Sequence, residues 1–248
     1  MSKALVVLSG GLDSCVALAK AREENDVCAA VSFNYGQRHM QMELNAAREI
    51  ATYYDIYHQV IDVAIGQGTS VLMHHDSEMP HLTYEELDKA EGPSPTYVPY
   101  RNGTFLSLAA SGALDMDADT IYAGMHGEDA HNWAYPDCTP EFIGAMQNAI
   151  YIGTYMKVRL VVPFTYMSKA DIVGLGLKLY APLAKTRSCY EGRDPACGQC
   201  PTCIGRLEAF KANGVSDPIE YEFDKYRDGM SKETVRASLT LADELRKS

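Results

Sequence analysis

The chain has 248 residues, of which 46% are hydrophobic and 22% are charged, and its formal net charge is −11. This length fits one large domain or one domain with small appendages, and the negative charge argues against direct binding to a nucleic acid backbone, which needs clustered lysine and arginine. No apolar run approaches the roughly 20 residues of a membrane-spanning helix, and the first residues lack the character of a secretory signal, so we expect a cytoplasmic protein without a membrane contact.

Apolar runs and helical patterns alternate along the chain, which predicts an α/β domain with a mostly parallel sheet. In such sheets ligands bind outside the carboxyl ends of the strands. The loops after Leu8, Phe33 and Gly124 should therefore share one crevice. The predicted strands are residues 4–8, 27–33, 57–63, 120–124 and 158–164, and the predicted helices are residues 14–24, 40–54, 103–115, 140–153, 168–179, 204–212 and 231–246.

The loop after the first predicted strand reads Ser9-Gly10-Gly11-Leu12-Asp13-Ser14 and leads directly into a predicted helix. Free backbone N–H groups and the positive end of the helix dipole make such a junction suitable for anions. An ordinary turn is the plainer interpretation, because glycine, aspartate and serine are common turn residues. The string resembles the pyrophosphate loop of the N-type ATP pyrophosphatases, which implies cleavage of ATP between its α- and β-phosphates.

Two further strings fall at the same predicted edge of the sheet. Tyr35 to His39 follows the second strand, and Arg38 or His39 is a candidate for phosphate contact, with a solvated helix start as the alternative. Arg101 and Asn102 precede a helix of small residues and suit a carboxylate or phosphate, although Asn102 as a simple helix cap explains the pair nearly as well. Between them, residues 66–101 form a long, proline-containing region that we expect to be a flap or part of a subunit contact.

Residues 124–138 follow the fourth strand and combine acidic side chains with the single tryptophan of the chain. A guanine-like ring presents adjacent N–H donors, which a carboxylate accepts as a pair, and an aromatic ring stacks on its face. His126 and His131 beside the acids offer a metal site as the alternative reading. The cluster is more typical of a functional loop than of a structural one.

Four cysteines lie between Cys189 and Cys203 with the spacing C-x7-C-x2-C-x2-C. Four thiolates at this spacing are typical of a closed tetrahedral zinc site, and the absence of an open ligand position indicates a structural metal. An iron–sulfur cluster is the competing interpretation, because ferredoxin sequences also step by two residues. Redox-active or unliganded thiols are the remaining alternative.

Together these strings, with Tyr135-Pro136-Asp137-Cys138, occur in the order that is seen in the 7-cyano-7-deazaguanine synthases, and the chain resembles that family over roughly residues 3–212. The resemblance implies an adenine nucleotide alpha hydrolase-like, Rossmann-like fold, bound zinc and a homodimer. We accordingly assign residues 1–185 to the ATP pyrophosphatase domain, 186–224 to a zinc-binding segment packed on it, and 225–248 to a helical extension. Two departures are Tyr100, where the family often has glycine, and the extra sequence after about Glu220.

The resemblance also implies a mechanism: a carbon–nitrogen ligase adenylates the carboxylate of 7-carboxy-7-deazaguanine, ammonia forms the amide, and a second ATP converts the amide to the nitrile with release of AMP and diphosphate. Asp13 would position Mg²⁺ or the loop, and charge at the α-phosphate would be stabilised by cationic side chains. The implied site residues are, for catalysis, Asp13, Ser14, Arg38, Arg101 and Lys185; for ATP, Leu8, Ser9, Gly10, Gly11, Leu12, Asp13 and Ser14; for the deazapurine, Tyr35, Gln37, Asn102, Glu128, Asp129, Tyr135 and Asp137; and for zinc, Cys189, Cys197, Cys200 and Cys203.

Three other functions stay open. A related ligase would stop at the amide or transfer the deazaguanine to a protein or nucleic acid. A tRNA thiolase of the same superfamily would need a sulfur-carrying cysteine near the loop and a basic RNA-binding face, whereas Cys15 lies too early in its helix and the chain is acidic. A non-enzymatic interaction module, with the cysteines as a zinc ribbon, is the third alternative, and the intact phosphate loop argues against it.

Overall fold

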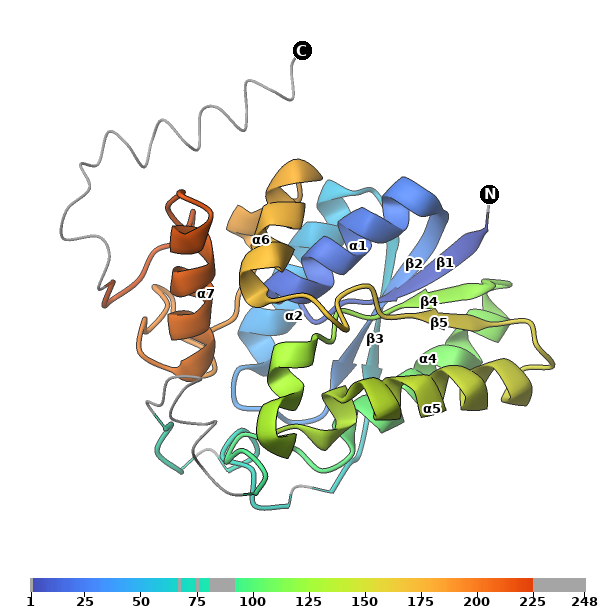
Figure 1. Cartoon of the computed structure of the whole chain (residues 1–248), viewed down its shortest axis with the longest axis horizontal. Coiled ribbons are helices and arrows are strands. Elements are labelled where there is room, and N and C mark those ends of the chain that lie inside the picture. Colours follow the sequence, from blue (N-terminus) through green and yellow to red (C-terminus); the bar gives the residue numbers. More distant parts are fainter. Residues whose placement is uncertain (1, 67, 75, 81–91, 225–248) are drawn as a thin grey trace, which may run out of the picture.

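The fold is built on a five-stranded sheet with strand order β3-β2-β1-β4-β5, in which every neighbouring pair is parallel. The computed structural model describes residues 2–66, 68–74, 76–80 and 92–224. All five predicted strands are present and the predicted parallel α/β architecture is confirmed (Figure 1). The strands are β1 (Lys3–Val7), β2 (Asp26–Asn34), β3 (Tyr57–Asp62), β4 (Thr120–Tyr122) and β5 (Arg159–Val161).

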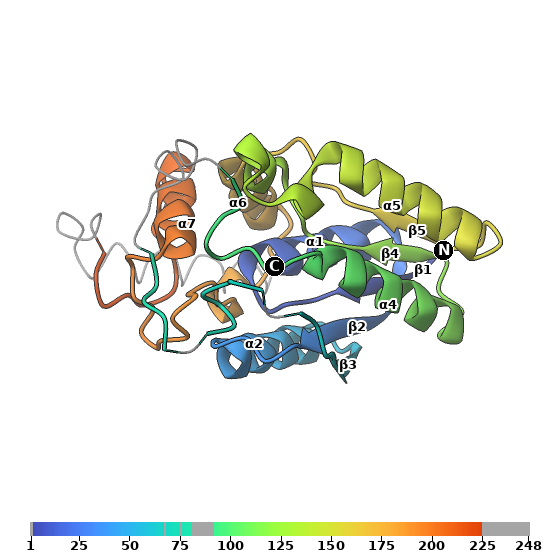
Figure 2. The ribbon, with the colours of Figure 1, turned by 90° about the horizontal axis from the view of Figure 1, so that it is seen from below.

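Helices cover both faces of this sheet (Figures 1 and 2). Buried side chains of α1 and α2 pack on one face, and those of α4 and α5 pack on the other. The six predicted helices within the described residues all occur, whereas the helix predicted at 231–246 lies outside them. Their bounds are α1 (Leu12–Glu24), α2 (Met40–Tyr53), α4 (Arg101–Asp115), α5 (Pro140–Gly153), α6 (Lys169–Lys178) and α7 (Pro201–Ala212), with short 3-10 turns η1 (Gly127–Trp133), η2 (Pro136–Cys138) and η3 (Leu183–Lys185).

Helix α1 is buried on two sides, because α6 and α7 pack against the side that faces away from the sheet (Figure 1). Its residues 14–19 are small or apolar, as expected for a helix segment surrounded by protein, and its remaining charged residues after Asp13 lie in the last turns. Cys15 and Leu18 face the sheet, while Val16 contacts the cluster that contains Ile172 and Phe210. This packing fixes the start of α1, and with it the loop after β1.

Glycine is required where that loop meets its neighbours. Gly10 has a φ of +88°, and a Cβ placed there would lie 2.2 Å from the carbonyl oxygen of Glu43 in α2. Gly124, after β4, approaches the other side, and its Cβ would lie 2.8 Å from the carbonyl carbon of Asp13. The loop is therefore held between α2 and the end of β4. Strands β1 and β4 are neighbours in the sheet, and the connections that follow them lead to strands on opposite sides, β2 and β5, which is where parallel sheets bind ligands.

The long region 66–101 lies partly outside the described residues. Its described part packs beside the loop after β2, where buried Leu72 and Val98 contact Tyr35. Arg38 donates from Nη1 to the carbonyl oxygen of Ser77 at 2.9 Å, which ties the region to the start of α2. Its role as a flap or a subunit contact stays a prediction.

A buried ion pair attaches the C-terminal segment to the sheet domain. Arg206 of α7 is fully buried, and its Nε and Nη2 donate to the two carboxylate oxygens of Asp217 at 2.6 and 2.9 Å. Its Nη1 donates to the Thr186 hydroxyl at 2.6 Å, and Tyr221 donates to Asp217 at 2.6 Å. Because both charges are paired and hydrogen-bonded, this segment packs as one unit with α7.

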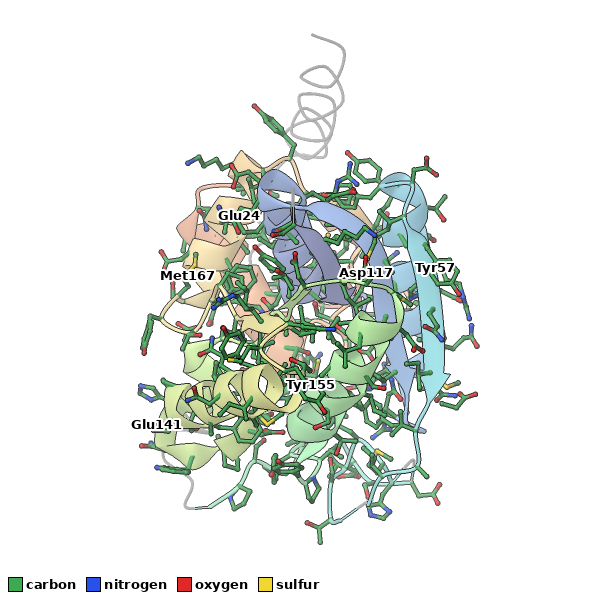
Figure 3. All side chains as sticks on the ribbon, turned by 90° about the vertical axis from the view of Figure 1, so that its right-hand side faces the viewer. Glu24, Tyr57, Asp117, Glu141, Tyr155 and Met167 are labelled. Carbon is green, nitrogen blue, oxygen red and sulfur yellow. The ribbon has the colours of Figure 1, made fainter. Side chains whose placement is uncertain are left out.

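The surface carries a few exposed aromatic side chains at the margins of the fold. Figure 3 shows Tyr57 on β3, the outer strand of the sheet, and Tyr155 just beyond the end of α5. Within the described ranges, no helix combines the length and apolar character needed to cross a membrane. The homodimer implied by the family resemblance stays a prediction.

We expect Gly10→Ala to destabilise the protein, because the new Cβ would meet backbone atoms of α2 at a positive φ. A loss of about 1–3 kcal/mol in the free energy of unfolding, measured with urea, is typical of such strain. Gly144→Ala in α5 is the matched control, since nothing lies within 4 Å of its Cβ and alanine favours a helix. Equal stability of the two variants would contradict the packing argument.

Arg206→Met should destabilise the protein more strongly, because it leaves the Asp217 carboxylate buried without its cation. Removal of one partner from a buried pair costs about 3–5 kcal/mol, which urea unfolding would measure. The matched change Lys3→Met removes the cation of an exposed pair with Asp117 and should alter stability little. A loss no larger for Arg206→Met than for this control would show that the buried pair does not hold the segment.

Candidate active site and metal centre

A pocket of about 210 Å³ lies at the carboxyl ends of the strands and brings together the loops after β1, β2 and β4. Leu8, Phe33 and Gly124 all line it, which confirms the predicted shared crevice. The starts of α4 and α6 and the segment before the cysteine cluster complete its wall. Of the predicted ATP and substrate residues, the wall contains Leu8, Ser9, Gly11, Leu12, Asp13, Ser14, Tyr35, Arg101, Asn102 and Asp129.

The loop after β1 is shaped by its two serines. The Ser14 hydroxyl accepts the backbone N–H of Ser9 at 3.2 Å and donates to the carbonyl oxygen of Gly11 at 3.0 Å. The Ser9 hydroxyl accepts the N–H of Gly11 at 3.2 Å. Gly11 is the N-cap of α1 and has no side chain to cap the first turn. The N-terminal N–H groups of α1 thus remain suited to an anion, as the sequence predicted for this loop.

Lys169, the first residue of α6, is a part of the site that we did not predict from the sequence. Its Nζ lies 2.5 Å from Oδ2 of Asp13, and both side chains line the pocket. Glu128 accepts the backbone N–H of Lys169 at 2.8 Å and so fixes the start of α6. The sequence indicated the location of Lys169 but not its contact with Asp13. The predicted strand 158–164 is followed by a predicted helix, so the start of that helix is expected at the same edge of the sheet as the crevice.

Electrostatic contacts keep Asp13 ionised. Burial alone would favour the neutral acid, but the nearby cation of Lys169 and the ring of His126 outweigh it and lower the pKa of Asp13. Its Oδ1 is buried and accepts no hydrogen bond from the described residues. A buried carboxylate oxygen without a donor is a suitable ligand for a hard divalent cation, so the site fits Mg²⁺ at this position.

The start of α4 forms a cationic corner of the pocket. Arg101 donates to the Tyr35 hydroxyl at 3.3 Å and lies over its ring, and the pKa of Arg101 is raised because neighbouring tyrosines and Asp137 outweigh its burial. Asp137 accepts the backbone N–H of Asn102 at 2.9 Å, and Asn102 donates to the Cys138 sulfur at 3.2 Å. Burial raises the pKa of Asp137. This network fixes Arg101 at the wall as a permanent positive charge.

The structure places several predicted site residues outside the pocket wall. Arg38 bonds to Ser77, Lys185 lies 3.8 Å from Glu49 at the surface, and Tyr135 bonds to Ser94 and Thr96. Glu128 accepts the backbone N–H of the first residue of α6, and Asp137 accepts that of the second residue of α4. Gln37 donates to Glu43, which is in the wall. The wall also contains His39, the alternative candidate for phosphate contact, together with Arg187 and Tyr190. Glu43 and Lys169 are charged residues of the wall that we did not predict.

The four cysteines of the C-terminal segment form one buried cluster. Sulfur atoms of Cys189, Cys197, Cys200 and Cys203 all lie within 4.8 Å of one another, and those of Cys197 and Cys203 are 3.9 Å apart. In a tetrahedron of thiolates around zinc, neighbouring sulfur atoms are about 3.8 Å apart for the usual zinc–sulfur bond length. The donor set therefore fits a four-coordinate metal with no open position.

Backbone N–H groups support these sulfur atoms. Cys197 donates its N–H to the Cys189 sulfur, and Gln199 and Cys200 donate theirs to the Cys197 sulfur, at 3.3 to 3.4 Å. Such donors stabilise thiolate charge around a metal. Gly198, with a φ of +75°, makes the tight turn between the ligands. The cluster is joined to the pocket through Tyr190, which directly follows Cys189 and lines the pocket.

Comparison with known proteins agrees with this arrangement. The sequence model of the family described as "Queuosine biosynthesis protein QueC" matches residues 3–214. The chain belongs to the QueC family. Its QueC relatives include a "7-cyano-7-deazaguanine synthase" of Thermoplasma acidophilum, 42% identical over 89% of this chain and 92% of that protein, and one of Marinobacter nauticus, 41% identical over 88% of this chain and 96% of that protein.

Solved structures also resemble the QueC chain, at low sequence identity. The "U34-tRNA thiolase NcsA from Methanococcus maripaludis with its [4Fe-4S] cluster" matches with a TM-score of 0.46 and 13% identity, over 94% of this chain and 80% of that one. A "4-thiouridine synthetase - RNA complex with bound ATP" matches with a TM-score of 0.45 and 15% identity, over 85% of this chain and 50% of that one.

We expect Cys200→Ser to lower the metal content of this QueC protein and to loosen the C-terminal segment, because ligand binding and folding are coupled in such clusters. Elemental analysis of the purified protein and proteolysis of residues 186–224 would measure the two effects. Cys28→Ser is the matched control, since Cys28 lies in β2, outside the cluster. Full metal content in Cys200→Ser would contradict the four-ligand site.

Proposed function

We propose that the protein converts 7-carboxy-7-deazaguanine and ammonia to 7-cyano-7-deazaguanine at the expense of two ATP molecules. The observation that carries this proposal is the phosphate loop at the start of α1, which opens into the same pocket as Arg101 in a chain of the QueC family. The named activity of the relatives supports the product, since they are described as 7-cyano-7-deazaguanine synthases and align along nearly their full length.

ATP would bind with its phosphates at the loop. The N–H groups at the start of α1 and the hydroxyls of Ser9 and Ser14 would hold the β- and γ-phosphates, which leave as diphosphate. Asp13 would hold Mg²⁺ through its buried, unpartnered Oδ1, and the bound cation supplies neutralisation of phosphate charge. Lys169 lies beside Asp13 and provides a positive charge for the departing group.

Arg101 would stabilise charge where the two substrates meet. The carboxylate oxygen of the deazapurine attacks the α-phosphorus and diphosphate departs; ammonia then attacks the acyl carbon, and AMP departs as the nitrogen loses a proton. The amide oxygen attacks the α-phosphorus of a second ATP and a second diphosphate departs; AMP then departs with that oxygen while the nitrogen loses its remaining two protons. A guanidinium held at the wall acts in both cycles, because anionic groups form in each.

The cysteine cluster would have a structural role in this scheme. We propose Zn²⁺ as its metal, since four thiolates leave no position for a substrate. Bound there, zinc would hold Tyr190 and Arg187 at the pocket wall, because both residues lie in the segment that leads into or through the cluster. Arg187 also donates its backbone N–H to the carbonyl oxygen of Gly10 at 2.9 Å, so this segment supports the phosphate loop directly.

Product analysis tests the proposed function. The protein is incubated with ATP, Mg²⁺, ammonia and 7-carboxy-7-deazaguanine, and the products are identified by mass. The expected products are the nitrile with two AMP and two diphosphate per turnover. Amide alone would instead identify a ligase that stops after the first cycle, and no AMP at all would exclude both.

Ser14→Ala should lower the rate of AMP release by at least about 100-fold, because the hydroxyl shapes the loop and would contact the phosphates of bound ATP. The fold should persist, as judged by circular dichroism and thermal unfolding. Ser111→Ala, at an exposed position of α4, is the matched control and should retain the wild-type rate. A wild-type rate in Ser14→Ala would exclude the loop as the site of ATP cleavage.

A further inference from the structure

Glu43 is a carboxylate in the pocket wall to which the scheme above gives no task. It lies in α2, one turn after the helix begins, and its side chain is about one-fifth exposed. An acidic side chain beside the site of two anionic substrates is unfavourable unless it meets a hydrogen-bond donor or a cation. A carboxylate at this position therefore suits a ligand group that carries hydrogen-bond donors.

Two neighbours hold this carboxylate by one oxygen. Gln37 donates from Nε2 to Oε2 of Glu43 at 2.9 Å, and Nε2 of His39 lies 3.5 Å from the same oxygen. Although burial opposes ionisation, the contacts with His39, Gln37 and Arg101 lower the pKa of Glu43. A carboxylate oxygen accepts about two hydrogen bonds, so Oε2 is engaged and Oε1 keeps both of its acceptor positions for the pocket.

The surroundings of Glu43 suit a flat heteroaromatic ring. Tyr35, Phe105 and Tyr190 line the same pocket, and the rings of Tyr35 and Phe105 are 5.3 Å apart. Arg101 adds a positive charge that acts on Glu43 from the start of α4. The pocket thus offers an acceptor, aromatic surfaces and a cation, which match the donor edge, the ring and the carboxylate of a deazaguanine acid.

The other acidic side chains near the pocket are engaged elsewhere. Asp137 and Glu128 accept backbone N–H groups at the starts of α4 and α6. Asp13 is paired with Lys169, and Asp129 lies 3.5 Å from His126. Asp13 and Asp129, like Glu43, make these contacts through one oxygen, but Asp13 is assigned to Mg²⁺ in the scheme above. Glu43 is distinguished by its electrostatic contact with both Tyr35 and Arg101 in the pocket wall.

We propose that Oε1 of Glu43 accepts the N1–H and the 2-amino group of the deazaguanine ring, and so determines which base the enzyme accepts. The inference rests on the proposed function and deepens it by assigning the recognition of the base to one residue. The ring lies against the aromatic wall, and its carboxylate points toward Arg101 and the phosphate loop.

Glu43→Gln is a sharp test because of the contacts on Oε2. Gln37 and His39 both present donors to that position, so the amide oxygen of the new side chain takes it. The amide NH₂ then faces the pocket, where it opposes the N1–H and the 2-amino group of the base, which are also donors. The comparison substrate is 7-carboxy-7-deazahypoxanthine, which lacks the 2-amino group and keeps N1–H.

The measured quantity is the ratio of kcat/KM for the two substrates, from AMP release. Wild-type protein should favour the deazaguanine by about 10- to 100-fold, because the analogue leaves an ionised acceptor without one donor. Glu43→Gln should bring the ratio to within about threefold of unity. Both kcat/KM values are proportional to the concentration of folded enzyme in the preparation, so their ratio does not change if part of the variant is misfolded. Glu49→Gln, an exposed position of the same helix, is the matched control and should keep the wild-type ratio.

Other outcomes would overturn the proposal. An unchanged ratio with a higher KM for ammonia would assign Glu43 to the incoming nitrogen, and an unchanged ratio with a higher KM for ATP would assign it to the ribose hydroxyls. Failure of the wild-type protein to release AMP with either acid would overturn the proposed function, and the inference about Glu43 would then be decided by binding alone. Calorimetric binding of the deazaguanine acid by that wild-type protein, lost in Glu43→Gln, would then show that the base is still recognised although the reaction differs.

Discussion

The pocket depends on how closely the loop after β1 approaches the elements on either side of it. A single methyl group at Gly10 would overlap a carbonyl oxygen of α2, and one at Gly124 would overlap the backbone at Asp13. This contact sets where α1 begins, and therefore where its unpaired N–H groups point. Helix α1 is also packed between the sheet and the α6–α7 pair, which keeps the start of α1 in position.

The second constraint is the attachment of the cysteine-bearing segment. Arg206 and Asp217 neutralise each other inside the protein, and Thr186 and Tyr221 satisfy their remaining hydrogen-bonding positions. The segment reaches from there to the pocket, where Arg187 bonds to Gly10 and Tyr190 faces His39. The cysteine cluster and the loop after β1, which are about 180 residues apart in the sequence, thus share one supporting element.

The sequence predicted the sheet, its helices and the position of the crevice, because those follow from apolar periodicity and from the rule that parallel strands end at one edge. It did not reveal Lys169, whose partner Asp13 lies 156 residues earlier, since only the packed fold brings them together. Glu43 also escaped notice, because a glutamate in an amphipathic helix looks like a solvated residue. Conversely, Asp137 and Glu128 have the sequence context of ligands, yet each accepts a backbone N–H at a helix start.

Helix α2 touches the loop and the pocket through the same residue. The carbonyl oxygen of Glu43 is the atom that excludes a side chain at Gly10, while its carboxylate lines the pocket. A shift of this helix by a fraction of an ångström would move both the phosphate cradle and the acidic wall. Binding of a ligand at one place is therefore expected to be thermodynamically linked to binding at the other. The first ligand to bind would meet the free-energy cost of ordering α2, so each ligand would raise the affinity for the other by the same factor.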